Sequence, residues 1–439
     1  MVGMNHRKKL MGKVIAVSLC ALLFIGCSGG KVPVEDTITP TLTPTQGPNG
    51  GQAEDSKYQI TKEELVPSTD TGQVTITDEM LQRSVLREGN LYRLSEVMKR
   101  AANGEEITIA FIGGSITDGN SANPKEDKCY AKLTYDWWVT SFPKAKINYV
   151  NAGIGATDSY LGVHRVKKDV LEKKPDLVIV EFSVNDYRAQ NKESYESLLR
   201  ALLNSETSPA VIPLALTQQN GSDYQTQHLA IAFYYDLTML SYRELILPEL
   251  ESGTIKWSEI ASDSDGTHPA NGGHAIIAKI LTNYFNSVRL QLDKIKDTSY
   301  TVKEDATTKN SYETSTIFDN TNMEPSANTG FEKETIANAQ FPNGWKTTEG
   351  GELSFEVEGK AFGIIYYGTV DGNSGKYEVL VDGEVVRTLD ANFQGKWGSY
   401  AEYEEVFKEK ESGKHTVSIR KASDSTAEQF IVLGITVAE

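Results

Sequence analysis

Ile107-Thr-Ile-Ala-Phe-Ile-Gly-Gly-Ser115 is the stretch that decides the fold of this chain. Residues 107–112 form a near-continuous apolar run, which is typical of a strand that helices cover on both faces. Further runs of this kind alternate with helical patterns. The runs are 147–150, 177–182 and 210–216, and the helical patterns are 90–102, 130–142, 160–171, 194–204 and 273–287. The alternation predicts an α/β domain with a parallel sheet over residues 75–295.

A different pattern begins after Asp293. Short apolar runs replace the helical periodicity, and two of them, 377–381 and 385–389, are joined by Asp382-Gly-Glu384. Such a junction is a hairpin signal. The pattern predicts a smaller all-β sandwich of the jelly-roll kind over residues 310–439.

Several aromatic residues of this second domain are candidates for stacking on sugar rings. The alternative is that they fill the core, because strands recruit aromatic side chains for packing. The candidates are Trp345, Tyr366, Tyr367, Trp397, Tyr400 and Tyr403.

Residues 1–26 have the pattern of a signal peptide, with basic residues before an apolar stretch over 14–25. That stretch is shorter than the roughly 20 residues a membrane span needs. The sequence Phe-Ile-Gly-Cys at 24–27 resembles the bacterial lipobox, although Leu is usual where Phe stands. The resemblance implies a lipid on Cys27 that anchors the protein to the outer face of the bacterial cell membrane. Ordinary secretion with an incidental cysteine is the alternative.

Residues 27–57 are rich in Pro, Thr, Gly and Ser, and we expect a disordered linker there because such a segment buries too little apolar surface to become ordered. The whole chain carries a net charge of −16, and removal of the four positive charges of the signal peptide leaves −20. A chain this acidic is repelled by phosphate backbones and anionic lipid headgroups. Nucleic acid is therefore excluded as a partner, and a membrane is expected only through the lipid anchor.

Four motifs stand where an α/β domain places its active site. They are 113–115 (Gly-Gly-Ser), 151–156 (Asn-Ala-Gly-Ile-Gly-Ala), 184–186 (Val-Asn-Asp) and 265–268 (Asp-Gly-Thr-His). The first three follow predicted strands, and the fourth lies in a loop before the last helix. Because the carboxyl ends of parallel strands converge on one crevice, we expect these motifs to meet there.

A serine nucleophile at Ser115 needs a base, and two of the six histidines lie in or beside the loop before the last helix. His268 follows Asp265 by three residues, a spacing that lets a tight turn place the carboxylate on Nδ1 while Nε2 faces the serine. His274 is the alternative base, although its position is more typical of a residue that packs or caps the following helix.

Acyl transfer also needs hydrogen-bond donors for the oxyanion. The candidates are the N–H of Ser115, an N–H in the turn Gly155-Ala156 and the side-chain amide of Asn185. A hydrogen-bonded turn residue is the structural alternative for Asn185. Whether Gly155 or Ala156 donates stays open, because alanine donates equally well unless the position needs a positive φ.

Together the motifs resemble the GDSL-type hydrolases, also called SGNH hydrolases, over about residues 105 to 285. The resemblance implies a flavodoxin-like three-layer α/β/α fold and a serine esterase. In that enzyme Ser115 is the nucleophile, His268 the base, Asp265 its orienting partner and Asn185 an oxyanion donor. It implies no metal and no other cofactor.

The chain departs from this family at two positions. Gly114 stands where the name motif has Asp, which is not a member of the triad, so the chemistry is expected to survive. Ala156 stands where glycine is usual.

We expect hydrolysis of small acyl esters, above all acetyl, on a polysaccharide. The loops 117–127 and 217–227 are polar, and Gln218 and Asn220 are well placed to meet sugar hydroxyls. This favours a sugar ester over the long acyl chains of a lipase, lysophospholipase or thioesterase. A non-catalytic carbohydrate-binding surface protein is the alternative from another class, and the complete triad speaks against it.

Overall fold

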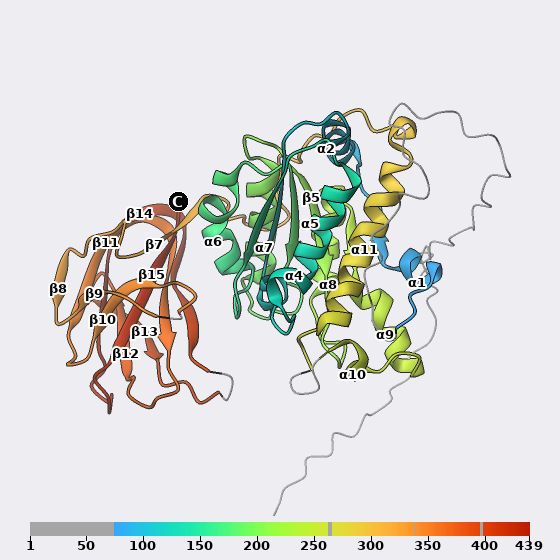
Figure 1. The fold of residues 1–439 in the computed structure, drawn as a ribbon. Helices are drawn as coiled ribbons and strands as arrows, with labels where there is room; N and C mark the ends of the chain where they lie inside the picture. The colour runs from blue at the N-terminus through green and yellow to red at the C-terminus, as the bar shows by residue number, and fades with distance from the viewer. Residues whose placement is uncertain (1–73, 262–265, 338, 396–397) are drawn as a thin grey trace, which may run out of the picture. The chain divides into compact units, whose positions relative to one another are not determined.

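The computed structural model describes residues 74–261, 266–337, 339–395 and 398–439. The expected signal peptide, Cys27 and the linker lie outside the described residues and stay predictions. Figure 1 shows a sheet with helices on its two faces, which we call the α/β domain, and an all-strand part, the β domain. Within the described part, no helix combines the length and apolarity that a bilayer crossing requires.

Six strands form the sheet of the α/β domain. They are β1 (Val85–Arg87), β2 (Ile107–Gly113), β3 (Ile147–Gly153), β4 (Leu177–Glu181), β5 (Ala210–Ala215) and β6 (Met239–Ser241). Their spatial order is β1-β6-β5-β4-β2-β3, with β2 to β6 parallel and β1 antiparallel at the edge. The parallel strands alone run 2-1-3-4-5, which is the flavodoxin-like order. The predicted fold is confirmed.

Helices connect and cover these strands. They are α1 (Asp78–Arg83), α2 (Tyr92–Ala102), α3 (Ser115–Asp118), α4 (Lys125–Lys128), α5 (Tyr130–Ser141), α6 (Ser159–Asp169), α7 (Asn191–Leu203), α8 (Gln225–Tyr234), α9 (Tyr242–Ser252), α10 (Trp257–Ile260) and α11 (Asn271–Arg289). Strands β1 and β6, which have three residues each, were not predicted from the sequence. Helices α8, whose start is polar, and α9, which contains Pro248, were not predicted either. A short strand or a polar first turn leaves too little periodicity to recognise.

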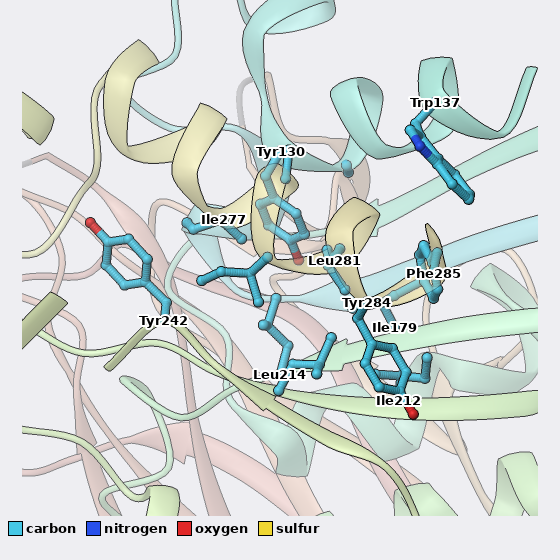
Figure 2. Close-up of a cluster of buried hydrophobic side chains, with 14 of the residues drawn as sticks. Tyr130, Trp137, Ile179, Ile212, Leu214, Tyr242, Ile277, Leu281, Tyr284 and Phe285 are labelled. Carbon is cyan, nitrogen blue, oxygen red and sulfur yellow. The ribbon is translucent and has the colours of Figure 1, made fainter. Parts of the chain in front are cut away.

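The helices divide between the two faces of the sheet. Successive side chains of a strand point to opposite faces. Ile179 of β4 therefore packs with Leu281 and Phe285 of α11, as Figure 2 shows, whereas its neighbour Val180 packs with α6 and α7. Trp137 of α5 joins the first cluster. Both faces are apolar, which explains the near-continuous apolar runs of the strands.

The β domain is built from antiparallel strands. They are β7 (Ser315–Phe318), β8 (Ala327–Thr329), β9 (Glu332–Thr335), β10 (Asn343–Thr347), β11 (Glu352–Gly368), β12 (Lys376–Val381), β13 (Glu384–Asp390), β14 (Tyr400–Lys421) and β15 (Phe430–Ala438). The register of β11 on β14 shifts between Gly359 and Ala361. Before this shift, residues 352–354 also pair with β8, and after it residues 361–366 also pair with β15. These pairings join the nine strands into one antiparallel sheet.

The predicted hairpin is present. Val381 pairs with Glu384, which leaves Asp382 and Gly383 as a two-residue loop with φ of 52° and 88°. Positive φ at both positions is characteristic of a type I′ turn, and Asp-Gly is a favoured sequence for it.

Three of the six aromatic candidates of the β domain are buried rather than exposed at its surface. Trp345 is fully buried against Phe355, and Tyr366 stacks on Phe430. Tyr403 is buried against the α/β domain. These three side chains are not available for stacking on a sugar. Tyr367 and Tyr400 are partly exposed, and Trp397 lies outside the described residues.

Candidate active site

Ser115 begins α3 directly after β2, and it is 8% exposed. The two preceding residues need to be glycine because the chain is crowded there. A Cβ on Gly113 would lie 2.1 Å from the Thr117 hydroxyl, and one on Gly114 would lie 2.6 Å from Oδ1 of Asn185. The absence of both side chains lets β2 turn sharply into α3 and presents the serine at the carboxyl edge of the sheet.

His268 lies beside this serine. Its Nε2 is 2.7 Å from Oγ of Ser115, and its side chain is half-buried. The loop that carries it is held by a hydrogen bond of 2.8 Å from the Gln219 N–H to the carbonyl of Gly266, where φ is +67°. Asp265 lies outside the described residues, so its role as orienting partner stays a prediction.

His274 lies inside α11 and is fully buried. Its Nδ1 accepts a hydrogen bond of 3.2 Å from the Tyr130 N–H, so the ring proton is on Nε2, which donates to the Asn120 carbonyl at 3.1 Å. Burial lowers the pKa of His274 to about 4. Because both ring nitrogens already bind the backbone, this histidine holds the segment around Asn120 in place.

The turn at 155–156 has an unusual backbone. Ala156 adopts φ +58°, a left-handed conformation that favours glycine. A Cβ on Gly155 would meet only Cβ of Ser115, at an ordinary 3.8 Å. The position that calls for glycine is therefore occupied by alanine. Hydrogen bonds from the Ile154 N–H to the Gly113 carbonyl and from the Thr157 hydroxyl to the Ile154 carbonyl hold the turn.

Asn185 follows β4 and packs against Gly114. Its backbone N–H donates to the Phe182 carbonyl at 2.9 Å, which closes the turn. Its side-chain oxygen is buried and accepts no hydrogen bond from any described residue. The side chain is therefore not needed to hold the turn, in contrast to the structural alternative considered from the sequence.

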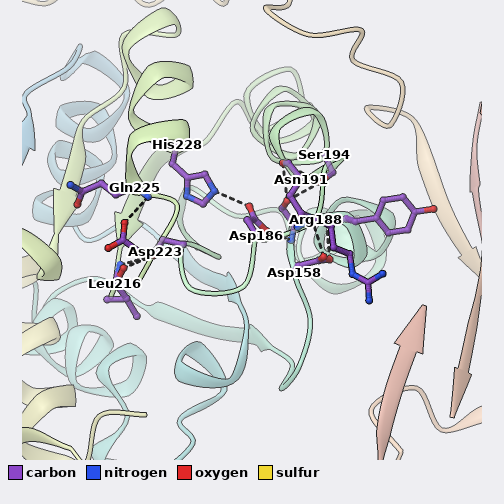
Figure 3. A network of polar contacts seen from close by, with 12 residues as sticks. Asp158, Asp186, Arg188, Asn191, Ser194, Leu216, Asp223, Gln225 and His228 are labelled. Atoms are coloured by element: carbon purple, nitrogen blue, oxygen red, sulfur yellow. Dashed lines mark hydrogen bonds and ion pairs between the residues drawn. The ribbon is translucent and has the colours of Figure 1, made fainter. Parts of the chain in front are cut away.

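A buried polar network around Asp186, the residue after Asn185, was not predicted from the sequence (Figure 3). Asp186 accepts a hydrogen bond of 2.8 Å from the Ser159 N–H, and a second hydrogen bond of 2.8 Å joins it to Nε2 of His228. His228 stacks on Tyr195 at 3.6 Å. Burial lowers the pKa of His228 to about 3, so the ring is neutral at pH 7. Asp186 belongs to a motif recognised in the sequence, but its partners come from distant segments.

Asp158 caps α6 on the other side of this network. Its Oδ1 accepts from the N–H groups of Tyr160 and Leu161, as an N-cap aspartate does. Its Oδ2 accepts from the Asn191 amide at 3.0 Å and from the Tyr403 hydroxyl at 2.5 Å. Burial, followed by the charge of Asp186, raises the pKa of Asp158 to about 6. An aspartate just before a helical pattern is the signal that predicts such a cap.

Two further residues hold the ends of β2 and β3 together. The buried guanidinium of Arg165 donates to the carbonyls of Ala152 and Gly113, at 2.6 and 3.0 Å. The amide of Asn151 donates to the Thr117 carbonyl at 2.9 Å. The turn into Ser115 is thereby attached to the neighbouring strand.

Glu181 lies beneath the start of α3, fully buried at the end of β4. It accepts a hydrogen bond of 3.1 Å from the Thr117 hydroxyl, which also contacts the Tyr130 hydroxyl at 2.7 Å. Burial raises the pKa of Glu181 to about 8. The carboxyl group is therefore mostly protonated at pH 7, which avoids a buried charge below the site.

The predicted sugar contacts in the loop at 217–227 stay predictions. Asn220 uses its side-chain oxygen to accept the Ser222 N–H at 2.9 Å, as a turn residue does. Gln218 is half-buried and bonds to Ser222 through its backbone. Gln219 rather than these two lies against the histidine loop, where its side chain faces Gly266.

Comparison with known proteins places this geometry in a family. Residues 111–276 match the model of the GDSL-like Lipase/Acylhydrolase family. An acetylxylan esterase of Geobacillus stearothermophilus is 25% identical over 215 residues, which are 41% of this chain and 93% of the relative.

Two solved structures match both domains. A two-domain esterase active on acetylated mannans, co-crystallised with mannopentaose, is 36% identical, with a TM-score of 0.74 over 82% of this chain and 98% of that chain. A second structure of a two-domain esterase active on acetylated mannans is 34% identical over the same shares, also with a TM-score of 0.74. The chain therefore belongs to the GDSL-like lipase/acylhydrolase family and is an ester hydrolase that carries an additional β domain.

Proposed function

We propose that this protein is a serine esterase that removes acetyl groups from a polysaccharide, with acetylated mannan as its first candidate substrate. The observation that carries the proposal is the 2.7 Å distance between Nε2 of His268 and Oγ of Ser115. A histidine within hydrogen-bond distance of a serine hydroxyl is the pair that nucleophilic acyl transfer requires. The relative that spans both domains is described as active on acetylated mannans, which supports the substrate class.

The reaction follows from the two side chains. Oγ of Ser115 attacks the acetyl carbonyl carbon while Nε2 of His268 takes the hydroxyl proton. The histidine then gives this proton to the departing sugar oxygen, and an acetyl-serine remains. The same nitrogen then takes a proton from water, whose oxygen attacks the acetyl-serine, and returns this proton to Oγ of Ser115 as acetate leaves. Asp265, three residues before the base, is proposed to orient the imidazole.

The oxyanion formed in each attack needs donors in place before the reaction. We assign this role to the N–H of Ser115, the amide of Asn185 and one N–H of the turn Gly155-Ala156. The Asn185 side chain suits the task because it follows β4 and lies against Gly114, the residue before Ser115. Removal of one such donor costs about 10²–10³ in rate.

Residues that precede the described part complete the proposal. A lipid on Cys27 would attach the enzyme to the outer face of the bacterial membrane, with the linker 27–57 as a spacer. The replacement Cys27→Ala is then expected to move activity from the membrane fraction to the soluble fraction.

The test compares acyl chain length and the leaving sugar. Purified protein is expected to hydrolyse p-nitrophenyl acetate, with rates that fall steeply towards the octanoate ester, and to release acetate from acetylated mannan faster than from acetylated xylan, pectin or peptidoglycan. Ser115→Ala is the matched control for background hydrolysis. Equal rates for Ser115→Ala and the unmodified protein would refute the esterase, and faster hydrolysis of octanoate would favour a lipase.

A further inference from the structure

One side chain of the β domain makes a hydrogen bond to a residue that supports the predicted oxyanion site. The hydroxyl of Tyr403, in β14, donates to Oδ2 of Asp158 at 2.5 Å, and both residues are buried. Asp158 lies two positions after Ala156 and caps α6 through its other oxygen. Asp158, two residues after the 155–156 turn, is therefore held both by its own helix and by a residue of the β domain.

Contacts on both faces keep the Tyr403 ring in place. It stacks on Tyr160 with 4.6 Å between centroids and 4° between planes. The Arg188 guanidinium lies 4.3 Å from the ring centroid, donates to the Tyr403 carbonyl at 3.2 Å and pairs with Glu402. A tyrosine enclosed in this way has little freedom to move its hydroxyl away from Asp158.

Asp158 also connects two of the expected oxyanion donors. The next residue, Ser159, donates its N–H to Asp186 at 2.8 Å, and Asp186 directly follows Asn185. The Asn191 amide bridges from α7 to Asp158 at 3.0 Å. A shift of Asp158 would therefore be transmitted both to the 155–156 turn and to Asn185.

We propose that Tyr403 is a positioning residue for ester hydrolysis, which holds Asp158 and, through it, the 155–156 turn and Asn185 in oxyanion-binding geometry. The β domain is then part of the support of the active site, and its contribution extends to substrates too small to touch it. This inference rests on the proposed function. It differs from a role of the β domain in holding polysaccharide, which would act on substrate binding alone.

The titration of Asp158 gives this role a signature. The charged and titratable groups around it are Asp186 after β4, Arg188 before α7, Tyr160 in α6 and Tyr403 in β14. The hydrogen bond from Tyr403 favours the carboxylate and opposes the upward effect of burial on the pKa. Loss of this hydrogen bond raises the pKa of Asp158 further. The fall of kcat on the acidic side of its pH profile is therefore expected at higher pH.

The decisive measurement is the hydrolysis of p-nitrophenyl acetate by Tyr403→Phe in the full chain. The variant keeps the stacked ring, and we expect kcat to fall about tenfold with KM little changed, because small displacements of positioned groups are costly in rate. The acidic limb of kcat is expected to move to higher pH. Tyr377→Phe is the matched control, since it removes a buried tyrosine hydroxyl bond of 2.6 Å within the β domain alone.

The outcomes separate this inference from the proposed function. An unmodified protein that does not hydrolyse the ester refutes the function. An active unmodified protein with kcat and pH profile unchanged in Tyr403→Phe, or with only KM for the polysaccharide raised, overturns the positioning role. If Tyr403→Phe does not fold, Asp158→Asn replaces it, because asparagine also caps helices. This variant is expected to lower kcat and to remove the Asp158 titration from the pH profile, and an unchanged profile contradicts the proposal.

Discussion

The regions around two histidines, His268 and His228, differ in exposure and in what the ring nitrogens contact. His268 is half-buried, and its Nε2 faces the Ser115 hydroxyl. His228 is fully buried, and its Nε2 faces Asp186 while Tyr195 covers its ring. The first is the proposed base for Ser115, whereas burial lowers the pKa of the second to about 3 and keeps it neutral at pH 7. Both residues are histidines, so it is their surroundings that suit one to proton transfer and the other to a structural role.

The largest expected effect tests the first region. His268→Ala removes the base, and kcat/KM for p-nitrophenyl acetate is expected to fall about 10³-fold or more, as for loss of a triad member. His274→Ala is the matched control, because both nitrogens of His274 bind the backbone, and it is expected to retain most of the kcat of the folded protein. The reverse ranking would show that His274 is the base.

The second region is tested by stability. His228→Phe keeps an aromatic ring on Tyr195 but leaves Asp186 without its imidazole partner. We expect a loss of about 1–3 kcal/mol in the free energy of unfolding at pH 7, since an unsatisfied buried polar group costs this much. Urea unfolding measures it.

The pH dependence of that loss follows from the pKa of His228, about 3 in the fold and ordinarily 6.5. Below about pH 6.5 the unfolded chain binds more protons than the folded one, so stability from the neutral ring is present at pH 7 and declines as pH falls. The difference between His228→Phe and the unmodified protein is therefore expected to shrink from pH 7 to pH 5. A difference that grows on acidification would contradict a neutral His228.

The smallest expected effect concerns the turn between the two regions. Ala156→Gly removes the cost of a left-handed alanine but adds backbone freedom to the unfolded chain. The net result is expected to be stabilisation by about 0.5–1 kcal/mol, with kcat changed less than twofold. Gly155→Ala is the control and is expected not to gain stability. A destabilised Ala156→Gly would show that alanine is not strained there.

Much of the fold is predictable from local patterns. Strands such as Ile107–Gly113 and helices such as Asn271–Arg289 are recognisable because both faces of the sheet, or one stripe of the helix, must be apolar. Met239–Ser241 was missed because three residues show no period. The role of the aromatic candidates of the β domain was ambiguous, because an aromatic residue in a strand gives the same sequence pattern whether it fills the core or contacts a ligand.

The candidate site also contains residues that were predictable from the sequence and residues that were not. Ser115 and Asn185 are predictable because short polar motifs follow apolar strands, and parallel strands bring their carboxyl ends together. The cap that Asp158 forms on α6 follows a local signal, but its contacts with Asn191 and Tyr403 were not predictable. The surroundings of Asp186 were not predictable either, because a carboxylate in sequence does not show which donors will surround it. Tyr403 lies 245 positions from Asp158, and no local pattern connects them.

Local sequence thus specified the layers of the α/β domain, the order of its motifs and the serine and histidine that the fold brings together. Periodicity and turn preferences act over a few residues, and they are therefore readable along the chain. The tertiary structure alone decided which histidine is buried and neutral, where the backbone takes a positive φ, and that a tyrosine of the β domain supports the site. These properties depend on burial and on contacts between distant segments, which exist only once the chain has folded.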